Sequence, residues 1–165
     1  MPSAARWGRC EGNTMINSRF VHLNLVARDW RALAAFYQDL FGCVIVPPER
    51  DYSGPALEAG TGIPGARLEG AHLRLPGSGG EGPTLEIFQY TPEEAHTPAP
   101  VNRPGYGHIA FSVEDVHDAR DAVLAHGGKS VGDVVTVKTA DGRKVTWVYV
   151  RDPEDNIIEL QSWSD

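Results

Sequence analysis

The sequence has few cysteines, no long hydrophobic run and no cluster of basic residues. Its two cysteines, Cys10 and Cys43, are too few and too far apart for a disulfide framework or a thiolate zinc site. No apolar run approaches the roughly 18 residues of a membrane span, and the N-terminal stretch lacks the apolar core of a signal peptide. The formal net charge of −7 is spread along the chain, which argues against binding to nucleic acid or to an anionic membrane surface. We therefore expect a cytoplasmic protein that binds neither membranes nor nucleic acids.

The length and composition fit one domain with a real hydrophobic core. The chain has 165 residues, of which 41% are hydrophobic. Residues 1–17 show no hydrophobic periodicity and include a second methionine, Met15. We interpret residues 1–17 as a flexible N-terminal arm and residues 18–165 as a single domain.

The first half of this domain, residues 20–90, predicts a strand, a helix and three more strands. Alternating residues 20–27 precede an amphipathic helix that Asp29 caps and Gly42 ends. Further strands are predicted near 43–47, 66–76 and 83–90. The segment between the first two of these, residues 47–65, is rich in proline and glycine and predicts a long loop that would suit a substrate lid.

The second half, residues 105–163, repeats this order. A strand over 107–113 is followed by a helix from Asp115 to Gly127 and by strands near 130–139, 143–151 and 156–163. The aspartate that caps the predicted helix and the glycine that ends it lie 13 residues apart in the first half (Asp29 to Gly42) and 12 in the second (Asp115 to Gly127). The repeat predicts an α+β fold of paired βαβββ modules, joined by the proline-rich segment 91–104.

Each predicted module has a histidine in its first strand and a glutamate in its last strand. These residues are His22 and Glu86 in the first module, and His108 and Glu159 in the second. Burying such groups without partners would cost several kcal/mol each, so they must be solvated, paired or bound to a cation. Two imidazoles and two carboxylates suit a divalent ion such as Zn, Ni, Co, Mn or Fe. If the four converge, a six-coordinate metal would keep two positions for water or substrate. The alternative is that each is a solvated residue on an exposed strand face.

Three segments together carry a family resemblance: FVHLNLVARDWRALAAFYQDLFGC, GYGHIAFSVEDVHDARDAVLAHGG and WVYVRDPEDNIIELQ. They resemble hallmark segments of the vicinal oxygen chelate superfamily, most closely its glyoxalase I-like members, and the resemblance covers about residues 20–163. It implies paired βαβββ modules that curl around a metal. The glyoxalase I order of ligands, His, Glu, His, Glu, falls on His22, Glu86, His108 and Glu159. The His-His-Glu triad of the superfamily's extradiol dioxygenases would be His22, His108 and Glu159, so the presence of Glu86 favours the isomerase type of site.

The resemblance implies a glyoxalase-like lyase or isomerase that acts on a small metal-chelated oxygenated substrate. Either Glu159 or Glu86 would serve as the base that removes a proton next to a carbonyl. The alternatives are an extradiol-type dioxygenase and a metal-free binding protein similar to the bleomycin-sequestering members. We also expect a homodimer, with the modules paired within one chain or exchanged between two.

Two positions depart from the glyoxalase I pattern. Bacterial glyoxalase I commonly has an arginine four residues after the first histidine and an asparagine four residues after the first glutamate, both used for glutathione. Here those positions are Val26 and Tyr90, which argues against a glutathione substrate. A third histidine, His72, lies inside a predicted strand, where a structural role and a place in the cavity are both compatible with the sequence.

Overall fold

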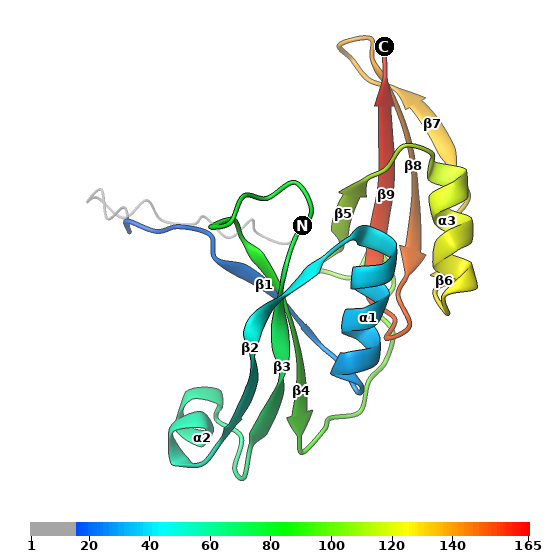
Figure 1. Ribbon diagram of the computed structural model, residues 1–165. Helices are drawn as coiled ribbons and strands as arrows, with labels where there is room; N and C mark the ends of the chain where they lie inside the picture. The colour runs from blue at the N-terminus through cyan, green and yellow to red at the C-terminus, as the bar shows by residue number, and fades with distance from the viewer. Residues whose placement is uncertain (1–15) are drawn as a thin grey trace, which may run out of the picture.

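The computed structural model of the protein describes residues 16–165, which form two consecutive modules (Figure 1). In the first module, β1 and β4 are parallel and the other neighbouring strands are antiparallel, in the order β1-β4-β3-β2. Its elements are β1 (His22–Val26), α1 (Trp30–Phe41), β2 (Val44–Ser53), α2 (Pro55–Thr61), β3 (Arg67–Arg74) and β4 (Thr84–Thr91).

The second module repeats this arrangement. Its sheet has the order β5-β9-β8-β6, with β7 also paired to β8, and its first and last strands are again parallel neighbours. The elements are β5 (Ile109–Ser112), α3 (Val116–Ala125), β6 (Lys129–Ser130), β7 (Val135–Lys138), β8 (Lys144–Arg151) and β9 (Ile157–Ser164). The predicted α+β fold of paired βαβββ modules is confirmed.

Both long helices begin where the sequence predicts. Asp29 accepts hydrogen bonds from the backbone N–H groups of Arg31 and Ala32, at 3.1 and 3.0 Å. Asp115 likewise accepts from the two N–H groups of the first turn of α3. These bonds satisfy donors that the helix itself leaves free. Gly42 ends α1 with φ 66°, a left-handed conformation that favours glycine.

The prediction of a long loop over residues 47–65 is wrong. β2 continues to Ser53, and α2 follows from Pro55 to Thr61. The prolines at 47 and 48 lie where the β2 register shifts, between Val46 and Arg50. β2 is an edge strand, so prolines that cannot donate to a ladder are tolerated there. Pro55 occupies the first turn of α2, where a missing N–H costs nothing.

One predicted strand of the second module is two separate strands in the structure. The strand predicted near 130–139 is divided into β6 and β7, which both pair with β8. Of the predicted N-terminal arm, residues 1–15 lie outside the described residues, as does Cys10.

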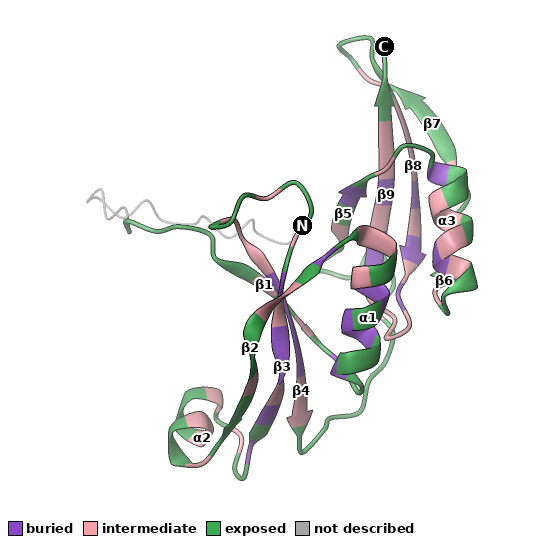
Figure 2. Ribbon diagram, viewed as in Figure 1, coloured by how far each residue is buried: buried purple, intermediate pink, exposed green. Residues whose placement is uncertain are grey.

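The helix α1 packs against both sheets. Its buried residues join the inward-facing side chains of β3 and β4, among them Leu73, Leu85 and Ile87. At its C-terminal end, Phe41 stacks on Phe111 of β5 with ring centroids 4.1 Å apart. Figure 2 shows the buried residues on α1 and along the central strands of both sheets. The two modules therefore share one core, and the face of each sheet opposite its helix is left for other contacts.

The turn between β8 and β9 links the two modules by hydrogen bonds. Asp152 is fully buried and accepts from the Tyr37 hydroxyl at 3.0 Å. It also accepts from the backbone N–H groups of Glu154 and Asn156 and from the Asn156 amide, all at 2.9 Å. Burial raises the pKa values of both Tyr37 and Asp152. The Asp152 side chain therefore stabilises its own turn and also binds Tyr37 of α1. In this way the DPEDN segment of the second module is attached to the first module.

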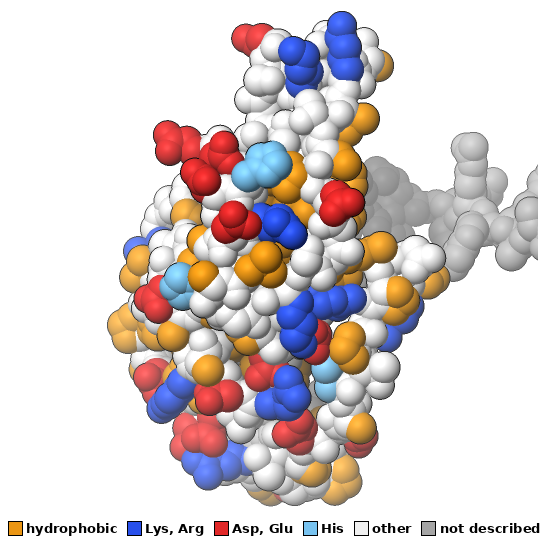
Figure 3. Space-filling model, turned by 90° about the vertical axis from the view of Figure 1, so that its right-hand side faces the viewer, with side chains coloured by type: hydrophobic (Ala, Val, Ile, Leu, Met, Phe, Trp, Pro, Cys, Tyr) orange, Lys and Arg blue, Asp and Glu red, His pale blue; other side chains and the backbone are white. Residues whose placement is uncertain are grey.

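Figure 3 shows basic and acidic side chains intermixed on the face that carries α3. Among residues 16–165, no helix has the length and apolarity to cross a membrane.

Candidate metal centre

The first half of the predicted site lies on the open face of the first sheet. Leu85 and Ile87 of β4 point into the core, so Glu86 between them points the other way. Its Oε2 lies 3.2 Å from Nε2 of His22 and accepts a hydrogen bond of 3.4 Å from the Asn24 amide. Glu86 is only 7% exposed. The parallel pairing of β1 with β4 brings these residues together, because Asn24 lies directly opposite Glu86.

His72 joins this half of the site. It lies opposite Glu86 in the β3–β4 ladder, and its Nε2 is 2.8 Å from Glu86 Oε1. Its Nδ1 is 3.0 Å from the Thr84 hydroxyl. Burial lowers the pKa of His72, while the charge of Glu86 opposes that shift. The sequence left the role of His72 open because the strand register, which pairs it with Glu86, was not known.

The second half lies at the equivalent place on the second sheet. His108, which directly precedes β5, has its Nε2 3.0 Å from Oε2 of Glu159 on β9. Tyr149 lies opposite Glu159 in the β8–β9 ladder and packs its ring against His108, with centroids 5.0 Å apart. Burial and the neighbouring Glu159 carboxylate raise the pKa of Tyr149.

The donor atoms of each pair fit a divalent metal. Two adjacent ligands at about 2.1 Å from one ion lie about 3 Å apart when they subtend a right angle. The His22–Glu86 and His108–Glu159 separations of 3.2 and 3.0 Å match this value. The two pairs belong to different sheets, and within residues 16–165 no group of three or more His, Cys, Asp or Glu side chains is arranged to hold a metal ion. The convergence of all four residues on one ion therefore stays a prediction.

Comparison with known proteins shows the family. A family model described as the Glyoxalase/Bleomycin resistance protein/Dioxygenase superfamily matches residues 19–160. The chain belongs to this superfamily. None of the curated proteins searched matches the chain.

Solved structures of this superfamily share the fold at low sequence identity. A glyoxalase family protein from Bacillus cereus is 21% identical, with a TM-score of 0.75 over 93% of this chain and 99% of that one. A glyoxylase/bleomycin resistance protein/dioxygenase domain from Frankia sp. EAN1pec is 18% identical, with a TM-score of 0.57 over 89% and 98% of the two chains. The fosfomycin resistance protein FosX from Listeria monocytogenes, solved with Mn(II) and sulfate, is 15% identical, with a TM-score of 0.50 over 90% and 93%. These likenesses establish the fold.

The two glutamates of this superfamily member differ in how they are held. Both oxygens of Glu86 have neighbours, since Oε1 faces His72 while Oε2 faces His22 and Asn24. Glu159 has one histidine neighbour, His108, and a further hydrogen-bonding neighbour, Tyr149. The side chain of Glu159 is also the more exposed, at 18% against 10% for Glu86. Glu159 therefore has fewer hydrogen-bonding neighbours than Glu86 and more contact with solvent.

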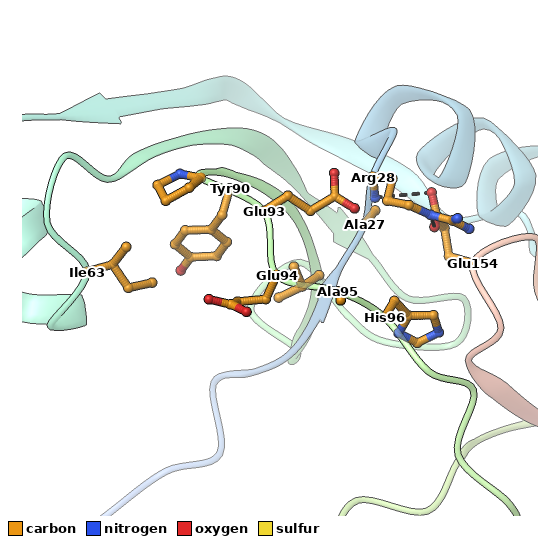
Figure 4. A pocket seen from close by; sticks show the side chains of 11 residues that line it. Ala27, Arg28, Ile63, Tyr90, Glu93, Glu94, Ala95, His96 and Glu154 are labelled. Carbon is orange, nitrogen blue, oxygen red and sulfur yellow. Dashed lines mark hydrogen bonds and ion pairs between the residues drawn. The ribbon is translucent and has the colours of Figure 1, made fainter.

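A pocket of about 370 Å³ lies beside the first half of the site (Figure 4). Val26 and Tyr90 both line it, on the same faces of β1 and β4 as Asn24 and Glu86. Burial raises the pKa of Tyr90, and the charge of Glu86 adds to the shift. Arg28 is the one Lys or Arg residue that lines this pocket, and its Nε donates a hydrogen bond to Glu154 at 2.7 Å. The remaining ionisable groups of the lining are Glu93, Glu94 and His96, so no Lys or Arg of the lining is left unpaired for an anionic ligand.

A second cavity, of about 310 Å³, lies along the segment that joins the modules. Asn24 from the first half of the site and His108 from the second both line it, together with Arg103 and Tyr106 of the joining segment. The joining segment thus runs beside both halves.

Proposed function

We propose that the protein is a metal-dependent lyase or isomerase that moves a proton next to a carbonyl on a small oxygenated substrate. The metal ligands would be His22, Glu86, His108 and Glu159. The observation that carries the proposal is the pair of His–Glu contacts, each about 3 Å long, at equivalent positions of the two modules. The Mn(II) complex of the Listeria fold relative supports it, because the same fold there accommodates a divalent ion.

The bound metal would supply Lewis-acid stabilisation of negative charge on substrate oxygens. Glu159 is the better candidate for the base, since it has fewer hydrogen-bonding neighbours and is more exposed than Glu86. A base must reach the proton that it removes, and a side chain with fewer hydrogen-bonding neighbours turns toward it more readily. Glu86, held at both oxygens, would remain in place as a ligand.

The complete centre would form between two copies of the chain. The face of the first sheet that carries Glu86 also carries Val26, Val44 and Tyr52, which are 53–57% exposed. The face of the second sheet that carries Glu159 carries three further exposed apolar residues, Val135, Val137 and Trp163. Exposed apolar surface around a polar site is typical of an interface. In a homodimer with two-fold symmetry, the first sheet of each copy would face the second sheet of the other. This arrangement would cover the exposed apolar residues and build two equal centres.

The pocket beside Glu86 favours an uncharged or cationic substrate over glutathione. At the two positions that depart from the glyoxalase I pattern, Val26 and Tyr90 present an apolar wall. Glu93 and Glu94 would repel the carboxylates of glutathione, and Arg28 is already paired.

Metal content and complementation between chains test the proposal. We expect one divalent ion per chain in protein purified without chelators, and loss of that ion in Glu86→Ala and in His108→Ala. Each of the single variants His22→Ala and Glu159→Ala should lose both centres of its homodimer. When these two variants are mixed and refolded together, heterodimers should regain one intact centre, because its four ligands come from the two unmutated modules.

The outcomes separate the alternatives. Lack of stoichiometric metal in the wild type would overturn the enzyme proposal and favour a metal-free binding protein. Wild-type metal binding with no recovery in the mixture would place the centre within one chain. For the reaction, we expect exchange of the proton next to the carbonyl of α-hydroxycarbonyl compounds with D2O, measured by NMR. Oxygen consumption with a catechol instead would indicate a ring-cleaving dioxygenase.

A further inference from the structure

The His72 side chain lies in a chain of hydrogen bonds that ends on Glu86. A carboxylate only accepts hydrogen bonds, so Nε2 of His72 must carry the proton that reaches Glu86 Oε1 across 2.8 Å. The other ring nitrogen, Nδ1, lies 3.0 Å from the Thr84 hydroxyl, which can donate to it or accept from it. Both ring nitrogens thus have a hydrogen-bonding partner, which fixes the orientation of the ring.

The packing around His72 also restrains it. Its ring meets those of His22 and Phe88 edge-on, each with centroids 5.9 Å apart. The Phe88 ring in turn lies against Gly70, where an added Cβ would be 2.5 Å from Phe88 Cδ1. These contacts restrict the rotation of the His72 ring beside Glu86.

The second module lacks this arrangement. The residue opposite Glu159 is Tyr149, in the place that His72 takes opposite Glu86. The two otherwise equivalent halves of the site thus differ in what faces the carboxylate from the neighbouring strand.

We propose that His72 is a positioning residue, which holds Oε1 of Glu86 and thereby presents Oε2 beside Nε2 of His22 for a shared metal ion. This inference rests on the proposed function. Carboxylates that bind metals are commonly oriented by such outer hydrogen bonds, and loss of the partner typically weakens metal binding about 10- to 100-fold. Without His72, Oε1 would be free to turn, and the ligand would lose its fixed orientation.

Cobalt(II) binding to the full-length protein tests this role. We expect His72→Ala to raise the dissociation constant for Co(II) about 10- to 100-fold and to change the visible absorption bands of the bound ion. His72→Gln places an amide N–H near the position of Nε2, and its affinity should return to within about threefold of the wild type. Thr84→Val should weaken binding less than His72→Ala, and the matched control Thr84→Ser should leave it unchanged. Size-exclusion chromatography and thermal unfolding establish that each variant is folded.

A double-mutant cycle decides whether His72 acts through Glu86. Glu86→Ala, which should lose its ion on purification, should still bind Co(II) weakly at high concentrations of the ion through the three remaining ligands. Adding His72→Ala to Glu86→Ala should cause no further loss of this residual affinity, since the carboxylate on which His72 acts is already gone. Equal losses in both backgrounds, or wild-type affinity and bands in His72→Ala, would overturn the inference while leaving the metal site intact. If His72→Ala does not fold, wild-type affinity and absorption bands in Thr84→Val would count against it in the same way. Failure of the wild type to bind Co(II) would instead remove the proposed function itself.

Discussion

Replacing Tyr37 with phenylalanine tests how the two modules are joined. The Tyr37 hydroxyl lies in the shared core and donates to Oδ2 of Asp152, which is fully buried. The Asn156 amide is the other donor to that oxygen. Tyr37→Phe removes one of these two donors and leaves the ring packing in place. The substitution therefore isolates a single hydrogen bond to a buried carboxylate.

The expected cost follows from the charge of the acceptor. A hydrogen bond to a charged group contributes about 1.5–3 kcal/mol to stability, so Tyr37→Phe should lower the free energy of unfolding by about 2 kcal/mol. For a chain of this size, each kcal/mol lowers the melting temperature by about 2–4 °C. We expect a drop of about 4–8 °C at pH 7. The matched control is Tyr106→Phe, since Tyr106 is 98% exposed, and it should change stability by less than about 0.5 kcal/mol.

The loss should also depend on pH. Burial raises the pKa of Asp152 above its ordinary value of 3.8, and the bond from Tyr37 opposes that shift. Without that bond, the folded-state pKa of Asp152 rises further. A group whose pKa is higher in the folded state lowers stability as pH rises from the unfolded to the folded value. The penalty of Tyr37→Phe should therefore be larger at pH 7 than near pH 4.

Urea unfolding of both variants at pH 4 and pH 7 measures these differences. A loss below about 0.5 kcal/mol at pH 7 would refute the assignment of a stabilising bond to a charged carboxylate. A loss of the same size at both pH values would show that the ionisation of Asp152 is not involved.

Three further substitutions give sharp expectations. Gly70→Ala should destabilise the protein by about 3 kcal/mol or more in urea unfolding, because its Cβ would lie 2.5 Å from a ring atom of Phe88. The control is Gly80→Ala, where an added Cβ has no atom within 4 Å. Equal stability of the two variants would contradict the packing argument. Glu159→Gln should slow proton exchange with D2O about 100-fold or more, since the base is lost, while Co(II) still binds; an undiminished exchange rate would assign the base elsewhere. Asp29→Ala should cost about 1 kcal/mol by loss of the α1 cap, and an unchanged melting temperature would contradict this.

The local sequence was sufficient for the two long helices, most strands and the repeat. Capping by Asp29 and Asp115 depends on residues two and three positions along the chain, so local composition predicts it. The alternation around His108 and Glu86 likewise identifies polar side chains on the outer face of a strand. The family resemblance, which rests on such segments, is confirmed by the family match over residues 19–160.

The edge of the first sheet could not be predicted in the same way. Residues 47–53 contain two prolines, and prolines there are compatible with a strand only because β2 has a neighbour on one side. Local composition does not say which strand lies at an edge.

By itself the sequence determined where the two long helices begin and end, that the chain is duplicated, and which histidine and glutamate each copy presents. Only the tertiary structure decided that His72 faces Glu86 while Tyr149 faces Glu159, and that Asp152 binds Tyr37 across the two modules. The physical reason is the range of the interactions. Caps and alternation involve neighbours along the chain, whereas strand register and module docking join residues that are brought together only when the sheets and the shared core form.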